Sequence, residues 1–377
     1  MFFCSMEKIR VLIVDDSVVI RRLVSDVLSS EAEIEVAGVA ANGRIALEKI
    51  AQLNPDVVTL DVEMPEMDGL QTLKQIRRMY PRLVVIMFST LTGRGAATTI
   101  DALSLGASDY VAKPASVGRA TAGIETIRAE LIPKIKALCG RTGVARTKPE
   151  NLRPVLEPKL LRRKLRAKFC RPEILAIGAS TGGPNALATI IPALPANFPL
   201  PIVIVQHMPP IFTRLLAERL AANSSIAVRE GVEGAELKAG TAWIAPGSFH
   251  MALEKTGTCY RIRLHQEAPE NSCRPAVDVL FRSVVKLYGP ATFGVILTGM
   301  GHDGFRGCQE IYQAGGQILA QDEASSVVWG MPGFVARAEL ADKVAPLNQL
   351  AGEIMCRVRG NLPDQKNERA DRGYFGL

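Results

Sequence analysis

Residues 9–17, IRVLIVDDS, form an apolar, β-branched run that stops at two aspartates and a serine. A short run of this kind is typical of a buried strand, and the polar residues mark the point where it ends. Apolar residues then recur at helical spacing over 20–28, which predicts an amphipathic helix. Asp16 or Ser17 can cap the start of that helix. The stretch therefore predicts a strand, a polar turn and a helix.

The same order of apolar run, polar residue and helical pattern recurs up to about residue 130. Alternating buried-type strands and helices indicate a parallel, doubly wound sheet. Functional residues of such sheets gather at the carboxyl ends of the strands. The later runs cover 56–60, 83–88 and 110–112, and the helical patterns cover 70–79 and 96–105. The polar residues at the strand ends are Asp15, Asp16, Asp61, Ser89 (or Thr90) and Lys113.

Carboxylates gathered at one edge of a sheet repel one another unless they hold a cation. Oxygen ligands favour a hard ion such as Mg²⁺. A lysine and a hydroxyl beside them can hold the oxygens of a phosphoryl group, which suits a carboxylate nucleophile that accepts that group. The competing interpretation is that each aspartate only caps a helix. Because such residues end one strand after another, the sequence favours the phosphoryl-accepting site.

These motifs resemble those of the response-regulator receiver domain. The resemblance rests on the DD pair, on DVEMPEMDG at 61–69, on the hydroxyl after the fourth strand and on the KP pair after the fifth. It implies a flavodoxin-like, five-stranded parallel sheet. It also implies phosphorylation at Asp61, Mg²⁺ held directly by Asp16 with Asp15 and Asp61, and a switch formed by Ser89, Lys113 and the rotating aromatic Tyr110.

The positive charge of the chain is concentrated in one segment. The net charge is +7, but residues 134–172 hold thirteen Lys or Arg against two acids, which is +11 and leaves −4 for the rest. Several prolines and little periodicity predict a solvated linker over 131–172. The stretch LLRRKLRAKF at 160–169 is alternatively a basic amphipathic helix. The predicted organisation is a receiver over 7–130, this linker, a second domain over 173–360 and a tail over 361–377.

The second domain repeats the α/β pattern, with apolar strands expected at 173–178, 201–205, 293–297 and 317–320. The turn at 178–182, GASTG, fits the G-x-S-x-G pattern of a nucleophile elbow, in which the serine sits on a tight strand-to-helix turn. A glycine-rich turn at a helix start also suits phosphate binding. The motif alone leaves these two interpretations equal.

A serine nucleophile needs a base that is oriented by an acid. His207 directly follows a strand whose end points the same way as Ser180. The other histidines are His250 in a loop, His265 in an alternating segment and His302 in the turn TGMGHDG. Asp303 is the leading acid because its turn, TGMGHDG, also follows a strand. The glycines of that turn keep it thin, and its amides can form an oxyanion hole.

Here the sequence resembles the catalytic domain of the chemotaxis protein-glutamate methylesterase family. The resemblance rests on IGASTGGP, VQHM, APG, RPAVDVLF, LTGMGHDG and AQDEASSVVWGMP, in that order. It implies a three-layer α/β/α domain with a mostly parallel sheet. It implies a triad of Ser180, His207 and Asp303, with the amide of Met300 in the oxyanion hole and no cofactor for the esterase step.

The family resemblance also implies the reaction and the partners. The substrates would be glutamyl γ-methyl esters on the cytoplasmic domains of methyl-accepting chemoreceptors, and particular receptor glutamines would be deamidated. A chemotaxis histidine kinase would phosphorylate the receiver, which at rest would block the catalytic edge. Three alternatives stay open: a DNA-binding output domain, a nucleotide-binding module and a non-catalytic module that keeps the fold.

Several further expectations concern the surroundings of the protein. No apolar run approaches the ~18 residues of a membrane span, and the first residues lack a signal peptide, so we expect a cytoplasmic protein. We also expect a monomer that binds no nucleic acid. The natural start is Met1 or Met6, and the sequence leaves both open. The cysteines are odd in number and never spaced CxxC, which argues against disulfides and against a zinc site. They are Cys4, Cys139, Cys170, Cys259, Cys273, Cys308 and Cys356.

Overall fold

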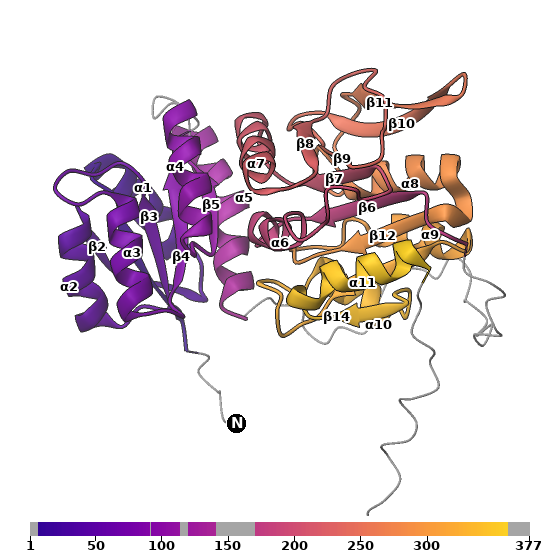
Figure 1. Ribbon diagram of the computed structural model, residues 1–377. Coiled ribbons are helices and arrows are strands. Elements are labelled where there is room, and N and C mark those ends of the chain that lie inside the picture. Colours follow the sequence, from indigo (N-terminus) through magenta and orange to yellow (C-terminus); the bar gives the residue numbers. More distant parts are fainter. Residues whose placement is uncertain (1–6, 91, 114–119, 141–169, 361–377) are drawn as a thin grey trace, which may run out of the picture.

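The computed structural model describes residues 7–90, 92–113, 120–140 and 170–360, which form two α/β units side by side (Figure 1). The first unit contains a five-stranded parallel sheet in the order β2-β1-β3-β4-β5. This order confirms the predicted flavodoxin-like receiver fold. Its strands are β1 (Ile9–Val14), β2 (Ile34–Ala40), β3 (Val57–Asp61), β4 (Val84–Ser89) and β5 (Asp109–Ala112). Its helices are α1 (Val18–Ser29), α2 (Gly43–Leu53), α3 (Gly69–Met79), α4 (Gly93–Ser104) and α5 (Ala120–Leu138).

Short polar residues fix where the receiver helices begin. Ser17 caps α1 by accepting a hydrogen bond from the amide of Ile20, so Ser17 rather than Asp16 is the cap. Asp68 and Thr92 cap α3 and α4 in the same way. Asp16 therefore stays available at the strand end, as the predicted metal site requires.

The second unit contains a seven-stranded parallel sheet in the order β14-β13-β12-β6-β7-β9-β8, together with a β10–β11 hairpin. The four predicted strands correspond to four adjacent strands of this sheet, β13-β12-β6-β7. The strands are β6 (Ile174–Ala179), β7 (Ile202–Gln206), β8 (Ala227–Glu230), β9 (Thr241–Ile244), β10 (His250–Thr256), β11 (Cys259–His265), β12 (Thr292–Ile296), β13 (Gln317–Gln321) and β14 (Lys343–Ala345).

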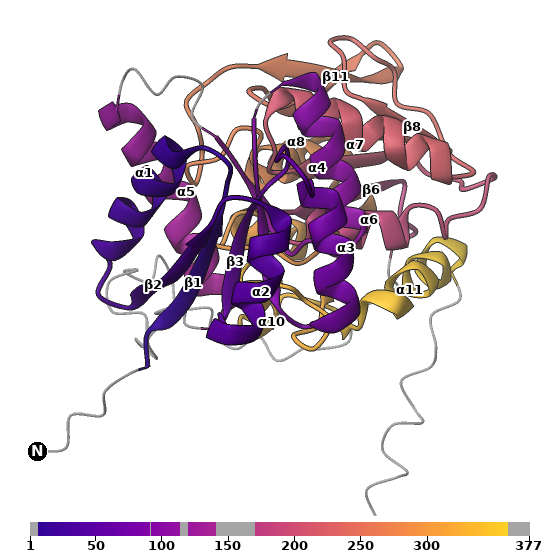
Figure 2. The ribbon, with the colours of Figure 1, turned by 90° about the vertical axis from the view of Figure 1, so that its left-hand side faces the viewer.

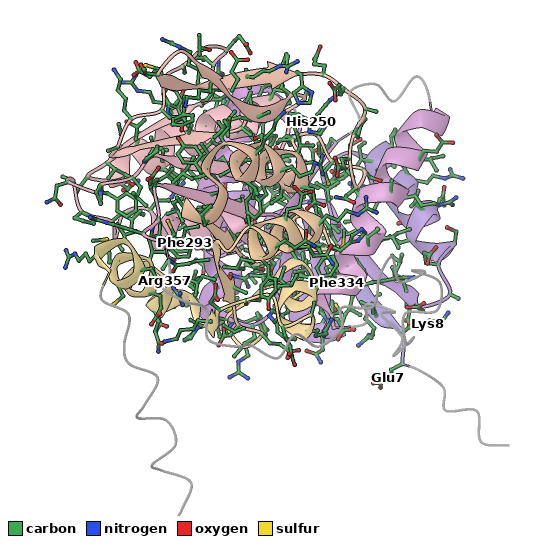
Figure 3. The ribbon with its side chains drawn as sticks, turned by 90° about the vertical axis from the view of Figure 1, so that its right-hand side faces the viewer. Glu7, Lys8, His250, Phe293, Phe334 and Arg357 are labelled. Carbon is green, nitrogen blue, oxygen red and sulfur yellow. The ribbon has the colours of Figure 1, made fainter. Side chains whose placement is uncertain are left out.

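Helices cover both faces of the larger sheet, which confirms the predicted three-layer architecture. Apolar side chains of α6, α7 and α11 pack on one face, and those of α8, α9 and α10 pack on the other, beside the hairpin. The helices are α6 (Gly183–Ile190), α7 (Pro210–Asn223), α8 (Val277–Tyr288), α9 (Phe305–Gln313), α10 (Met331–Arg337) and α11 (Leu347–Arg359), with a 3₁₀ turn, η1, at Gly289–Ala291. In Figure 3 the Arg357 side chain of α11 reaches toward Phe293 of β12, 5.9 Å from the ring centroid.

The last receiver helix is longer than the sequence predicts. We expected the receiver to end at 130, but α5 continues to Leu138. Two lysines assigned to the linker are therefore receiver residues: Lys134 pairs with Asp109 at 3.2 Å, and Lys136 pairs with Glu31 at 2.9 Å. These ion pairs and the apolar face of the helix extend it past the expected boundary. Residues 141–169, including the basic stretch at 160–169, and the tail at 361–377 lie outside the described residues.

The two units contact each other through α4 and β5 of the receiver and α7 of the second unit (Figures 1 and 2). The ring of Tyr110 stacks on Phe212 with centroids 4.5 Å apart. Arg219 donates hydrogen bonds to the carbonyl of Ile100 and to the carboxylate of Asp101, at 3.0 and 2.9 Å. We call this set the interdomain contact. None of the helices described here is both long and apolar enough to cross a membrane.

Candidate active site and phosphorylation site

Asp303 lies in the turn between β12 and α9 and is almost fully buried. Its carboxylate accepts hydrogen bonds from the backbone amides of Val277, Asp278 and Gly304, at 2.6, 3.1 and 3.0 Å. The first two amides belong to the first turn of α8, where the helix dipole also favours a negative charge. Burial alone would raise the pKa of Asp303, but a hydrogen bond from His207 and these amides lower it below its usual value.

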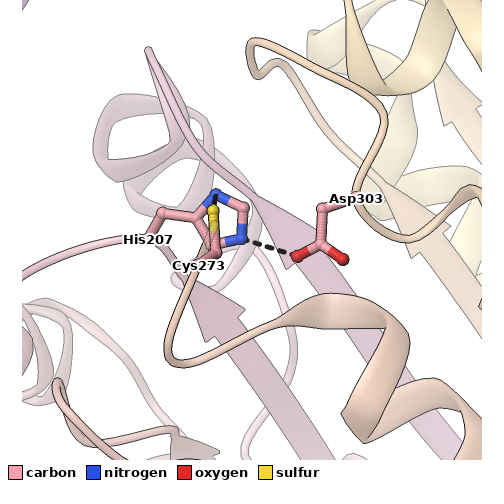
Figure 4. A group of neighbouring side chains, drawn as sticks. All are labelled: His207, Cys273 and Asp303. Atoms are coloured by element: carbon pink, nitrogen blue, oxygen red, sulfur yellow. Dashed lines mark hydrogen bonds and ion pairs between the residues drawn. The ribbon is translucent and has the colours of Figure 1, made fainter. Parts of the chain in front are cut away.

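His207 follows β7 directly, as predicted, and its ring lies between a carboxylate and a thiol (Figure 4). Nε2 lies 2.8 Å from Oδ2 of Asp303, and Nδ1 lies 3.6 Å from Sγ of Cys273. Burial disfavours the charged ring, but hydrogen bonds with Asp303 and Cys273 raise the pKa of His207 above its usual 6.5. The Asp303 contact places the Nε2 proton, and Nδ1 is the nitrogen left to exchange a proton with a neighbour.

Ser180 lies at the end of β6, between the strands that carry the other two residues. Ala179 pairs with Gln206 in the sheet, so Ser180 and His207 come next to each other at adjoining strand ends. Among the hydrogen bonds of the described residues, none joins the Ser180 hydroxyl to the His207 ring. The sheet order β12-β6-β7 thus brings the three predicted residues to one edge, with the histidine–aspartate bond already formed.

Two side chains that the sequence analysis did not single out hold the serine turn in place. Gln206 donates from Nε2 to the carbonyl of Ser180 at 2.9 Å. On the other side, Ser180 donates its amide to the carbonyl of Thr298 at 3.1 Å, and the Thr298 hydroxyl donates to Thr181. Gln206 is the last residue of β7, and Thr298 lies two residues after the end of β12; this position at a strand end is the signal that could have identified them.

The turn that contains Met300 approaches the serine closely. A Cβ on Gly299 would lie 2.8 Å from Cβ of Ser180, so this position requires glycine. The turn is anchored through Gly299, whose amide bonds to Val328 and whose carbonyl accepts from Met331. In the described part of the chain, none of the anchoring hydrogen bonds uses the Met300 amide. The Met300 amide, which is the predicted oxyanion-hole donor, therefore does not anchor the turn. It follows Gly299, which lies close to Ser180.

A second carboxylate lies behind Asp303. Asn271 donates from Nδ2 to both Asp278 and Asp303, at 2.9 and 2.8 Å, and so bridges two buried acids. Burial, and then the neighbouring Asp303, raise the pKa of Asp278 to about 6, although the Gly307 amide opposes this rise. The RPAVDVLF motif is thereby explained: it starts the helix that holds Asp303. Asn271 lies in an irregular loop, where no periodic pattern indicated its position.

The other three histidines serve other purposes. His250 is buried on the hairpin (Figure 3), where its ring contacts the carbonyl of Ala268 and the amide of Ala276. His265 lies opposite it on the partner strand, with ring centroids 5.2 Å apart. His302 is exposed and packs against Phe334. None of them contacts the group around His207 and Asp303 in the described residues.

The predicted acidic cluster of the receiver also forms. Lys113 lies between two carboxylates, with Nζ 2.7 Å from Oδ2 of both Asp15 and Asp61. Carboxylate oxygens of Asp15, Asp16 and Asp61 approach within 4.8 Å of one another. Burial raises the pKa of Asp61 to about 6, with Lys113 opposing the rise and Asp15 adding to it. A donor set made only of carboxylate oxygens fits a hard divalent cation.

The other two predicted switch residues, Ser89 and Tyr110, lie on the adjoining strands β4 and β5. Ser89 is fully buried at the end of β4, and its hydroxyl donates to the carbonyl of Thr90 rather than to Asp61. Tyr110 on β5 is buried in the interdomain contact, against Phe212. The predicted rotating aromatic therefore touches α7, the helix that begins shortly after His207.

Comparison with known proteins agrees with both halves of this description. A family model described as CheB methylesterase matches residues 175–354, and one described as response regulator receiver domain matches residues 11–125. The crystal structure of the Thermotoga maritima CheB methylesterase catalytic domain is 42% identical and covers 49% of this chain and 98% of its own, with a TM-score of 0.48.

Two curated relatives share the name protein-glutamate methylesterase/protein-glutamine glutaminase. The one from Trichodesmium erythraeum (strain IMS101) is 55% identical over 353 residues, 94% of this chain and 100% of its own. The one from Nocardioides sp. (strain ATCC BAA-499 / JS614) is 50% identical over 362 residues, 95% of this chain and 98% of its own. These matches do not favour a DNA-binding, nucleotide-binding or non-catalytic output domain. The chain belongs to the protein-glutamate methylesterase/protein-glutamine glutaminase family, with a response-regulator receiver domain followed by a CheB methylesterase domain.

Proposed function

We propose that this enzyme demethylates glutamyl γ-methyl esters, and deamidates particular glutamines, on the cytoplasmic domains of methyl-accepting chemoreceptors. Ser180 is the nucleophile, His207 the general base and Asp303 the orienting acid. The observation that carries this proposal is the 2.8 Å bond between His207 and the buried Asp303, next to a serine on the adjoining strand end. The protein would act as a cytoplasmic monomer.

The geometry supports a definite course for the proton. Asp303 occupies Nε2, so Nδ1 of His207 takes the hydroxyl proton of Ser180 as its oxygen attacks the ester carbonyl. The Met300 amide stabilises the oxyanion. The imidazolium then gives its proton to the leaving methoxide, and methanol departs. Water hydrolyses the acyl-enzyme by the same base and restores Ser180 with a free glutamate product.

The acidic cluster supports phosphorylation of Asp61 by a chemotaxis histidine kinase. Asp15, Asp16 and Asp61 would hold the ion, and Mg²⁺ fits their oxygen donors. When bound, the ion neutralises charge on the transferred phosphoryl group. Lys113 already spans Asp15 and Asp61 and would pair with a phosphoryl oxygen, while the Ser89 hydroxyl turns toward it.

The interdomain contact supports a regulatory role for the receiver. Phosphorylation would move Ser89 and Tyr110, and a change at Tyr110 would weaken its stacking on Phe212 of α7. Because α7 starts close to His207, the resting receiver covers the approach to the catalytic edge. Loss of the contact would uncover that edge for the receptor.

Release of methanol from methylated receptor membranes tests the proposed reaction. The Ser180→Ala variant is expected to fall to background, a loss on the order of 10⁶ in kcat. Ser224→Ala, at the end of α7, is the control and should keep its rate. A phosphodonor with Mg²⁺ should accelerate the unaltered protein. Methanol release that survives Ser180→Ala would exclude the proposed nucleophile.

Arg219→Ala tests the regulatory proposal without touching either site. It removes two hydrogen bonds of the interdomain contact, and an exposed pair of this kind is worth up to about 1 kcal/mol. The rate without phosphodonor should rise by up to about fivefold, and the phosphorylated rate should stay the same. Arg214→Ala, which breaks only an exposed pair with Glu218 on the same helix, should change neither rate. An unchanged resting rate in Arg219→Ala would contradict the covering role.

A further inference from the structure

A thiol lies against the catalytic histidine on the side away from Asp303. Sγ of Cys273 is 3.6 Å from Nδ1 of His207 (Figure 4). Sulfur, imidazole and carboxylate donors of Cys273, His207 and Asp303 all lie within 4.8 Å of one another. The proposed ester hydrolysis does not use the thiol, and its position therefore calls for a separate explanation.

The distance between these two donor atoms is the one that a tetrahedral zinc ion needs. Zinc binds cysteine sulfur at about 2.3 Å and histidine nitrogen at about 2.0–2.1 Å, which at a tetrahedral angle separates the two donors by about 3.6 Å. The sulfur and Nδ1 are already that far apart. Asp303 on Nε2 keeps the proton on that nitrogen and leaves the Nδ1 lone pair for the ion. Histidines that ligate zinc commonly carry a carboxylate in this position.

The loop that carries Cys273 holds the thiol in place. The backbone of Cys273 exchanges two hydrogen bonds with Glu270, at 2.8 and 3.1 Å. The Glu270 carboxylate is fixed by both terminal nitrogens of Arg282, at 2.7 and 2.6 Å. Asn271 within the loop is tied to Asp303 and Asp278. Little reorganisation is therefore needed before an ion binds.

We propose that Cys273 and His207 form a reversible zinc site, with Sγ and Nδ1 as the protein ligands and water in the remaining positions. The thiol gives its proton to solvent as the Zn–S bond forms. The lack of CxxC spacing predicted no zinc site, but here the ligands come from two separate loops, which spacing rules do not detect. Bound zinc occupies the nitrogen that must take the Ser180 proton, and so it inhibits the enzyme; this consequence rests on the proposed function, whereas the binding does not.

Cobalt binding to the full chain tests the site directly. Co²⁺ in place of Zn²⁺ gives a thiolate-to-metal charge-transfer band in the near ultraviolet, and Zn²⁺ should abolish that band by displacement. Cys273→Ser and His207→Ala should lose the band, while Cys170→Ser, at an exposed free cysteine, should keep it. Thermal unfolding monitored by circular dichroism checks that the variants fold. Absence of a band in the unaltered protein, or its persistence in Cys273→Ser, would overturn the proposal.

Inhibition gives the second measurement, with Mg²⁺ in excess. Each variant is compared with its own rate in the absence of zinc. Cys273→Ser should raise the zinc concentration for half inhibition at least tenfold, because one of two protein ligands is lost. Asp61→Asn should leave that concentration unchanged, since the acidic cluster lies in the other domain. A protein without esterase activity that still shows the cobalt band would refute the proposed function and leave the zinc site standing.

Discussion

Two buried aspartates near strand ends, one in each domain, differ in the direction of their pKa shifts. Asp61 ends β3 of the receiver, and Asp303 lies in the turn after β12 of the catalytic domain; each residue is 3% exposed. Burial raises the pKa of both, but only Asp61 ends with a raised value, about 6. Hydrogen bonds hold the pKa of Asp303 below its usual value. Position near a strand end thus does not decide whether the pKa of a buried carboxylate is raised or lowered.

The number of hydrogen-bond donors explains the difference. Asp303 accepts from the first turn of α8, from Gly304, from Asn271 and from His207. Asp61 accepts one long backbone hydrogen bond, 3.4 Å from Glu63, and otherwise depends on Lys113. A carboxylate with many fixed donors stays charged and orients a partner. A carboxylate with few donors gains from a cation and keeps lone pairs for chemistry, which suits the two proposed roles.

Replacement of the well-satisfied carboxylate should have the largest effect. Asp303→Asn removes the charge that balances the His207 imidazolium, and the amide can hold the ring in the wrong tautomer. We expect kcat for methanol release to fall by about 10⁴. The control is Asp322→Asn, the same change at the end of β13, which should retain most of the activity. A loss smaller than tenfold would remove Asp303 from the proposed triad.

The same replacement in the receiver should stabilise the protein. Asp61 titrates near pH 6 when folded, against 3.8 in its unperturbed state, so the folded chain binds this proton more tightly and loses stability as pH rises through that range. Asp61→Asn has no carboxyl to ionise, so its stability does not fall in this way as pH rises. Its free energy of unfolding at pH 7, without divalent cations, should exceed that of the unaltered protein by up to about 3 kcal/mol.

Urea unfolding followed by circular dichroism measures this difference. The gap between Asp61→Asn and the unaltered protein should shrink as pH falls below 6 and nearly vanish below about pH 3, where the carboxyl is protonated in both the folded and the unfolded state. Added Mg²⁺ should narrow the gap at pH 7, because it binds the ionised cluster. An Asp61→Asn variant less stable than its parent at pH 7 would contradict the contrast between the two aspartates.

A smaller change should make Asp303 more like Asp61. Asn271→Gly removes the amide that bridges Asp303 and Asp278 and keeps a residue suited to the backbone there, where φ is 52°. The facing carboxylates then raise each other's pKa. Activity should fall by about 10- to 100-fold, and the acid limb of the pH–rate profile should move to higher pH. Ser272→Gly, where φ is 63°, is the control. If the acid limb of the pH–rate profile moves equally in both variants, Asn271 does not position Asp303.

The strand ends were predictable because each buried run stops at a polar residue. That pattern located Asp15, Asp61 and Lys113 in one domain, and His207 and Asp303 in the other, before any geometry was known. The family resemblance assigned their roles, which a strand-end position does not do.

The parts that escaped prediction depend on irregular or long-range structure. Asn271 and Cys273 reach the site through a loop with two residues of positive φ, which no periodic pattern describes. The interdomain contact depends on which faces of α4 and α7 meet, and an apolar helix face looks the same whether it packs on its own sheet or on another domain. The three-residue β14 and the four-residue β8 and β9 were not predicted. The equally short β5 was predicted, because the KP pair follows its apolar run directly.

The stacking of Tyr110 on Phe212 affects how active the enzyme is before it is phosphorylated. Under the proposed regulation, esterase activity without phosphorylation comes from the small fraction of molecules whose two domains have separated. That fraction depends on the strength of the interdomain contact. If the interdomain contact is weaker by about 1.4 kcal/mol, the activity of the unphosphorylated protein rises tenfold, while the active site and the phosphorylation site stay intact. Evolution can therefore tune background against dynamic range at one aromatic pair, independently of how fast the enzyme is phosphorylated or how fast it turns over.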